Sequence, residues 1–421
     1  MKSGLGFLMA ALRCEIEGLE QLARTGELVG TIGRLVHALQ RERGICNVLL
    51  ASRGQRFAEQ RREQVAESQH MEAAVRRSFE QLAAQSRIGN GARLFSRVAW
   101  VLPGLDALPE LRRRIGMLEI DAAESTAAFV KLIAGLLAVV FEAADGATDP
   151  EISRVLVALF NFMQGKEFAG QERACGAAAF ASGRNDGARQ QQWLHLIDSQ
   201  ERCFKVFVSF SNAALAQLWR ANQPPAQIAE LERLRRIACA APAGVSLDPE
   251  LSPLWFDCCT QRIDAMQAVE EQLAGQLRSI CEQKTAEVRA ELAAHEALLL
   301  TLADTSGAPG AAFFDSHGLA QPAGDAAPYG RQLERSILDM VQDQSQRLQA
   351  MSDELETVRT ALNERKVVER AKGLLMAHRR ISEQEAHKML RQTAMNQGRR
   401  LTEVAESVLA MAELLPRNAA P

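Results

Sequence analysis

Two segments determine the expected fold: ERGICNVLLAS at residues 42–52 and ERACGAAAFAS at residues 172–182. When one is laid on the other, both begin with Glu-Arg and end with Ala-Ser, and small or apolar residues lie between. A glycine follows each segment directly or after one further residue. The match predicts an internal repeat. We therefore expect two similar helical bundles that present equivalent arginines, Arg43 and Arg173.

The composition around these segments favours helices. Alanine, leucine, glutamine, glutamate and arginine dominate, aromatic residues make up only 5%, and no stretch alternates apolar and polar residues as a strand would. A chain of 421 residues is too long for one ordinary core, so several folding units are expected. The sequence predicts an all-α protein.

Neither a membrane span nor a disulfide framework is expected. The run at 126–144 is strongly apolar, but it contains Lys131 and Glu142 and is short for a bilayer, so a buried bundle helix is predicted. The eight cysteines are scattered without any C-x-x-C pair, which favours free thiols in a reducing cytoplasm.

Composition breaks divide the chain. Residues 304–330 are rich in glycine, proline and alanine and predict a flexible linker after a helical domain at 1–303. Apolar residues at alternating four- and three-residue steps over 331–362 predict a coiled-coil helix. Two interpretations of this stripe stay open: a homodimer or higher oligomer, or one long helix packed on its own protein.

The C-terminal part carries a local excess of positive charge. Residues 359–400 hold eleven basic and four acidic side chains within a chain of net charge −3. Such an excess is typical of a protein that binds a phosphate backbone, although the charge alone also fits a DNA-recognition helix. No aromatic residue follows Tyr329, so bases cannot stack on aromatic rings there. This favours reading the shape of a folded RNA.

The segment RKVVERAKGLLM at 365–376, with matching residues up to about 412, resembles the ANTAR domain. The resemblance covers 351–412 and implies a three-helix bundle that follows a coiled coil and recognises paired hairpin loops in leader mRNA. It implies RNA contacts from four basic residues and close approach at two small ones: Lys372, Arg399, Arg400 and Arg365, with Ala371 and Gly373. Simple helix packing is the alternative for the two small residues.

The segment LQRERG at 39–44 and the second stretch at 161–174 resemble the NIT domain. This resemblance implies nitrate or nitrite as the signal ligand, bound by Arg43, Arg173 and a third arginine, Arg236 or its neighbour Arg235. Guanidinium groups suit the ligand because they offer coplanar N–H donors to a flat, weakly hydrated anion. Alternatively, Arg43 pairs with Glu42 or another bundle carboxylate. Ala174 replaces the glycine of the first motif and predicts that the two halves are not equivalent.

The order of the two resemblances predicts a NIT–ANTAR antiterminator in which the sensor withholds the basic bundle until the anion binds. Two rivals stay open: a DNA-binding regulator, and a constitutive RNA-binding protein with a scaffolding front half. An enzyme, a metal site and a cofactor are not expected, since the seven histidines show no metal-ligand spacing and no glycine-rich phosphate loop follows a strand.

Overall fold

The computed structural model describes residues 4–84, 91–145, 147–183, 187–240 and 245–303, parts of 346–379, and residues 383–397 and 399–413. All regular elements of these residues are helices, which confirms the all-α prediction. The predicted linker at 304–330 lies outside the described residues, as does most of the predicted coiled coil. The first ten helices are α1 (Gly4–Ala51), α2 (Ala58–Ala84), α3 (Gly91–Asp106), α4 (Leu108–Gly116), α5 (Ala122–Asp145), α6 (Pro150–Ser182), α7 (Gly187–Phe210), α8 (Ala213–Ala221), α9 (Pro225–Cys239) and α10 (Leu251–Ala303).

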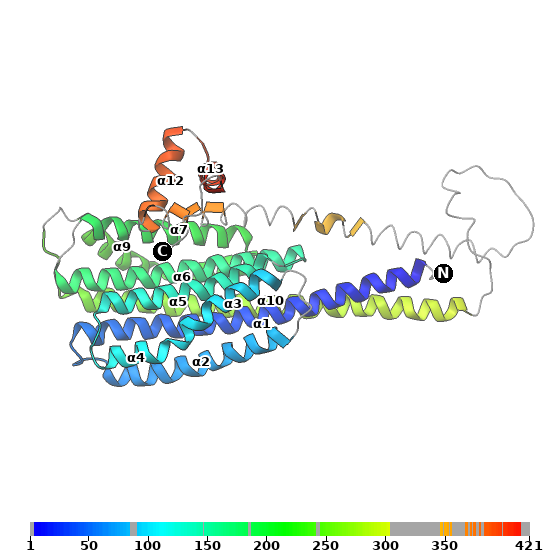
Figure 1. Ribbon diagram of the computed structural model, residues 1–421, viewed down its shortest axis with the longest axis horizontal. Helices are drawn as coiled ribbons and strands as arrows, with labels where there is room; N and C mark the ends of the chain where they lie inside the picture. Colours follow the sequence, from blue (N-terminus) through cyan, green and yellow to red (C-terminus); the bar gives the residue numbers. More distant parts are fainter. Residues whose placement is uncertain are drawn as a thin grey trace, which may run out of the picture.

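These helices form two sets with a similar succession of long and short helices. In each set a long helix is followed by a second helix, two short helices and another long one, so that α1–α5 correspond to α6–α10. In each set the first helix packs on the second and on the last, and α1 and α6 also contact the other set through α10 and α5. Two similar bundles, as the internal repeat predicts, therefore share one elongated body (Figure 1).

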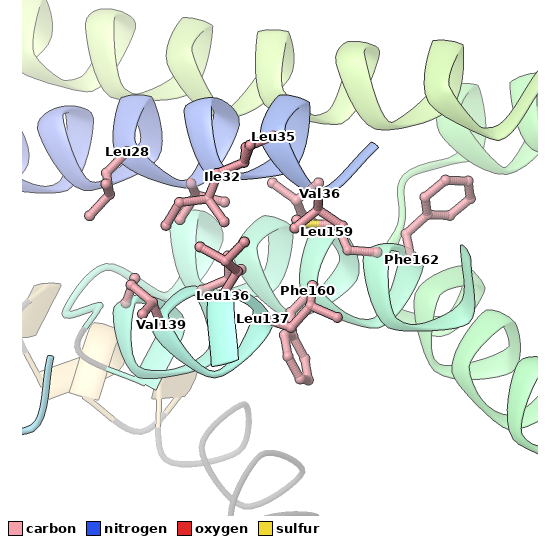
Figure 2. Packing of buried hydrophobic residues seen from close by; sticks show 14 of the residues in the cluster. Leu28, Ile32, Leu35, Val36, Leu136, Leu137, Val139, Leu159, Phe160 and Phe162 are labelled. Atoms are coloured by element: carbon pink, nitrogen blue, oxygen red, sulfur yellow. The ribbon is translucent and has the colours of Figure 1, made fainter. Parts of the chain in front are cut away.

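The main core lies where α1, α5 and α6 meet. Figure 2 shows Leu28, Ile32 and Val36 of α1 facing Leu136 of α5 and Leu159 of α6. These side chains are buried, and they belong to one continuous apolar cluster that also includes α3 and α10. Helix α5 is long and apolar enough to cross a membrane, yet 61% of its most apolar window is buried inside this protein. It is the core helix that the sequence predicts.

A second, aromatic core surrounds the far end of α6. Phe180, Trp193 and Trp255 come from α6, α7 and α10, and the two indole rings lie 4.8 Å apart between centroids at an interplanar angle of 70°. Residues at both ends of α6 fix its length. Asp149 caps the first turn by accepting from the Ile152 amide, and Gly183 ends the helix in the left-handed conformation. The second glutamate-arginine motif, Glu172 and Arg173, therefore lies on α6 between the two cores.

Near the C-terminus, α12 (Glu383–Gln397) and α13 (Leu401–Glu413) pack together with described residues of 367–375. Their small core contains Ala371, Leu390, Ala394, Val404 and Ala405. In Figure 1 these helices lie against α7.

The described part of the coiled-coil segment contacts the protruding ends of α1 and α10. Arg347 donates to Glu15 at 2.6 Å and to Glu291 at 3.2 Å. These contacts fit a helix packed on its own protein. The dimeric coiled coil stays a prediction.

Candidate anion-binding site

The first motif arginine is fully buried and already has a counter-ion. Arg43 of α1 donates through Nη1 and Nη2 to the two oxygens of Glu167 on α6, at 2.6 and 3.2 Å. Gln40 and Gln171 donate to the same carboxylate, each at 2.9 Å. The predicted alternative for Arg43, a bundle carboxylate, is therefore what this structure shows, with Glu167 in place of Glu42. The Nε of Arg43 has no hydrogen-bond partner among the described residues.

The second motif arginine is buried without a carboxylate. The Arg173 guanidinium donates to the Thr260 hydroxyl and to the Gln40 carbonyl, both at 3.0 Å, and it lies 5.1 Å from the ring centroid of Phe256. No carboxylate of the described residues forms an ion pair with it. Burial and the neighbouring Arg43 lower the pKa of Arg173 to about 10. The two arginines thus lie close together, and one of them lacks a counter-ion.

Glycines allow both arginines to cross between α1 and α6. A Cβ at Gly44 would lie 2.6 Å from Nη2 of Arg173, and a Cβ at Gly170 would lie 2.5 Å from Nη2 of Arg43. Each guanidinium therefore packs directly on the backbone of the opposite helix. The glycines occupy different positions of the two motifs, because Ala174 stands where the first motif has its glycine. As the sequence predicts, the two halves are not equivalent here.

The motif glutamates hold the short helices in place. Glu42 accepts from Nε and Nη2 of Arg112 on α4 at 2.8 and 2.9 Å, and Glu172 accepts from Nε and Nη2 of Arg235 on α9, both at 2.7 Å. All four side chains are buried. These matching bidentate pairs support the internal repeat, since α4 and α9 hold the same place in their halves. Arg235 is therefore committed to a structural ion pair.

Arg236 does not reach the site. Its side chain is exposed and its Nε lies 3.4 Å from the Glu232 carbonyl of the same helix. The structure thus does not bring the third predicted arginine to Arg43 and Arg173, because the helical rotation between positions 235 and 236 turns the second of them to solvent.

The ion pairs around the two motif arginines leave Arg173 without one. Lys166, fully buried, pairs with Glu270 on α10 at 2.6 Å, and Glu167 pairs with Arg43. Glu167 and Asp264 act on Arg173 only electrostatically, without a direct ion pair. An anion of single charge could therefore pair with this guanidinium. In the part of the chain that the structure describes, no group of histidine, cysteine or acidic residues could hold a metal ion.

The predicted RNA contacts are distributed unevenly. Lys372 is buried, whereas Arg399 and Arg400 are exposed, and Arg399 pairs with Glu403 at 3.3 Å. Ala371 is fully buried in the core of the small bundle, which favours helix packing over close approach of RNA. Gly373 and Arg365 lie outside the described residues.

The small bundle contacts the sensor through α7. The rings of His195 on α7 and His387 on α12 lie 5.6 Å apart. A cavity of about 450 Å³ between the two parts is lined by Arg202, His387, Arg391, Ala394, Met395, Arg399 and Leu401. Burial and these cationic neighbours, with Lys372 first among them, lower the pKa of His387 to about 4. Part of the basic surface of the small bundle thus faces Arg202 of α7.

Sequence reasoning missed the partners of the motif arginines. Glu167 lies next to Lys166 in a segment that the NIT resemblance includes, but its pairing with Arg43 depends on the crossing of α1 and α6. Thr260 and Phe256 come from α10 and carry no local signal. The recurrence of Glu-Arg in both motifs could have indicated that two further arginines were needed to neutralise the glutamates.

Comparisons with known proteins agree with this architecture. The NIT family, described as nitrate and nitrite sensing, matches residues 34–278, and the ANTAR domain matches residues 356–409. A nitrate regulatory protein of Klebsiella oxytoca is 35% identical over 408 residues, which cover 96% of this chain and 94% of that protein. The solved structure of the NasR transcription antiterminator is 32% identical, with a TM-score of 0.58, and the match covers 97% of this chain and 99% of the other.

Proposed function

From the premise that the chain belongs to the nitrate- and nitrite-sensing NIT family and carries a C-terminal ANTAR domain, we propose that the anion binds at Arg173 beside Arg43 and releases the ANTAR bundle for leader mRNA. The protein is a regulator of transcription antitermination, and its ANTAR domain is the RNA-binding part. The ligand position, the hairpin target and the direction of the switch are our proposals.

One observation carries the proposed ligand site: the buried guanidinium of Arg173 forms no ion pair with a carboxylate of the described residues. A buried charge without a counter-ion destabilises the folded state by several kcal/mol, on the order of what burial of one ion costs. A guanidinium has five N–H donors in one plane, and Thr260 and Gln40 use two of those of Arg173. Nitrate and nitrite are planar, singly charged and weakly hydrated, so they can accept from the remaining donors at a low cost of dehydration.

Contacts of α6 and α7 supply a route from the anion to the RNA-binding part. Glu172 precedes Arg173 and accepts from Trp193 at 3.1 Å and from Gln200 at 2.6 Å, both on α7. The same helix carries His195 and Arg202 on the side that meets the ANTAR bundle. We infer that a shift of α6 on anion binding moves α7 and loosens this contact. The anion drives the shift only through its different affinity for the two arrangements.

The docked bundle supports the direction of the switch. Arg391 and Arg399 of the ANTAR domain line the cavity that faces Arg202, so this part of the basic surface is turned towards the sensor. We propose that the undocked bundle binds paired hairpin loops of a leader transcript in the cytoplasm, and that two copies of the chain act as a homodimer through the heptad segment at 331–362.

Binding to a two-hairpin leader RNA tests the proposal. Wild type and Arg173→Met are titrated in nitrate, nitrite or chloride at constant ionic strength. We expect nitrate or nitrite to tighten RNA binding by wild type and to leave the variant unchanged. Equal affinity in all three salts would support the constitutive RNA-binding rival. Preference for duplex DNA over the leader RNA would support the DNA-binding rival.

A further inference from the structure

The two halves exchange matching contacts where α1 crosses α6. The alignment that lays Glu42 and Arg43 on Glu172 and Arg173 also lays His37 on Glu167 and Gln40 on Gly170. The contacts follow this alignment. Arg43 of α1 reaches Glu167 and packs on Gly170, while Arg173 of α6 donates to the Gln40 carbonyl and packs on Gly44. The crossing is therefore an approximate twofold arrangement of the two motifs.

One pair of corresponding positions, His37 and Glu167, differs in charge. Arg43 has the carboxylate of Glu167, but the position of α1 that corresponds to Glu167 holds the imidazole of His37, and Arg173 is one of the three cations that act on it. Burial, together with the charges of Lys166, Arg41 and Arg173, lowers the pKa of His37 to about 3. The imidazole is thus neutral at physiological pH and does not balance Arg173. Its Nδ1 is buried and has no hydrogen-bond partner among the described residues, and neither has Oε1 of Gln40, one helical turn away.

We propose that the anion occupies the place of the carboxylate that His37 lacks, so that a planar oxyanion on Arg173 repeats the pairing of Glu167 with Arg43. His37 is then the residue that determines whether the sensor needs a ligand. This inference rests on the proposed function and adds to it the reason why one arginine of the pair is left for the anion.

The arrangement also defines how the bound anion is held. It lies between the guanidinium of Arg173 and the neutral imidazole, whose single N–H can donate to an anion oxygen. A carboxylate has the planar shape and single charge of nitrate, so a glutamate at position 37 would pair with Arg173 as Glu167 pairs with Arg43. A glutamine at position 37 would keep a neutral donor and would leave Arg173 without a counter-ion.

Three forms of the full-length chain test this: wild type, His37→Glu and the matched neutral control His37→Gln. Each is unfolded thermally in nitrate, nitrite or chloride at constant ionic strength, and anion affinity is measured by calorimetry. We expect wild type and His37→Gln to be stabilised by the anion with affinities within about threefold of each other. His37→Glu should melt at a higher temperature than His37→Gln in chloride and should bind the anion at least tenfold more weakly.

A second background separates pairing from a general effect on folding. In an Arg173→Met chain the new carboxylate of His37→Glu lacks Arg173, and the other cations near it, Lys166 and Arg41, already pair with Glu270 and Glu67. There it should lower the melting temperature instead of raising it. Anion binding by His37→Glu as tight as by wild type would overturn the proposal. So would equal loss of binding in both variants, because the imidazole itself and not the missing carboxylate would then decide binding. If wild type binds neither anion, the proposed function fails. The effects of His37→Glu on the melting temperature, opposite in the chains with and without Arg173, would still test whether position 37 lacks a carboxylate.

Discussion

Removal of either motif arginine should have opposite consequences for stability, although both side chains are buried in corresponding helices. Arg43→Met leaves the carboxylate of Glu167 buried, with a side-chain exposure of only 2%, and removes the cation that forms its ion pair. Breaking a buried ion pair in this way costs about 3–5 kcal/mol of unfolding free energy. We expect the sensor of this variant to lose most of its stability.

Arg173→Met removes a charge that is not balanced. The lowering of the Arg173 pKa from 12.5 to about 10 corresponds to roughly 3 kcal/mol against the buried charged form. The variant loses hydrogen bonds to Thr260 and Gln40 of about 1 kcal/mol each, and about 1 kcal/mol of attraction to the ring of Phe256. These contributions nearly cancel, so the unfolding free energy should stay within about 1 kcal/mol of wild type.

Urea unfolding followed by tryptophan fluorescence measures this difference. All four tryptophans, Trp100, Trp193, Trp219 and Trp255, lie in the sensor, so the signal reports the sensor without the ANTAR bundle. Trp255 donates from its indole to the carbonyl of Arg173 at 3.0 Å and reports the site directly. Equal destabilisation by both substitutions would refute the reasoning, since Arg173 would then be balanced without any ligand.

Three further outcomes are expected. Glu167→Gln should lower the unfolding free energy by about 3 kcal/mol in chloride, because it leaves a buried guanidinium unpaired, and nitrate should restore part of that loss in the same urea titration. Gly44→Ala should weaken nitrate binding measured by calorimetry, since its Cβ would lie 2.6 Å from the guanidinium of the ligand arginine, whereas Gly18→Ala, with nothing within 4 Å, should leave binding unchanged. Docking of α12 on α7 should weaken as the pH falls from 6.5 towards 4, because undocked His387 regains its ordinary pKa and takes up a proton, while the docked form does not. Amide hydrogen exchange of residues 193–202 measures the docking, and His387→Gln should remove the dependence on pH.

The sequence predicted the helical class and the repeat because both leave local signals. Composition and the spacing of apolar residues identify helices, and the recurring Glu-Arg and Ala-Ser pairs relate α1 to α6. Arg43 and Arg173 were singled out by the repeat and by the resemblance to the NIT domain. The RNA-binding part was identified from its charge and from its resemblance to a known domain.

The pairing of charges could not be predicted in the same way. Which carboxylate meets Arg43 depends on how α1 crosses α6, and a sequence does not give the angle or register of a helix crossing. The difference between Arg235 and Arg236 is one step of helical rotation, which buries the first and exposes the second. The packing of the ANTAR bundle on α7 depends on contacts between segments far apart in the chain, such as His195 with His387.

The charge at Arg173 also limits how strongly one site can act. If an anion offset all of the roughly 3 kcal/mol against the buried charged form, its affinity would differ at most about 150-fold between an arrangement that buries this guanidinium and one that exposes it to water. A shift from 1:99 to 99:1 between two states requires about 5.5 kcal/mol. A single site therefore supplies about half of the free energy that such a shift requires. Two sites whose chains move together would supply about 6 kcal/mol, on the order of a complete shift. The proposed anion site and the predicted coiled-coil dimer therefore bear on one another: the buried charge would set the free energy of each site, and a dimer of the predicted kind would bring two such sites to one switch.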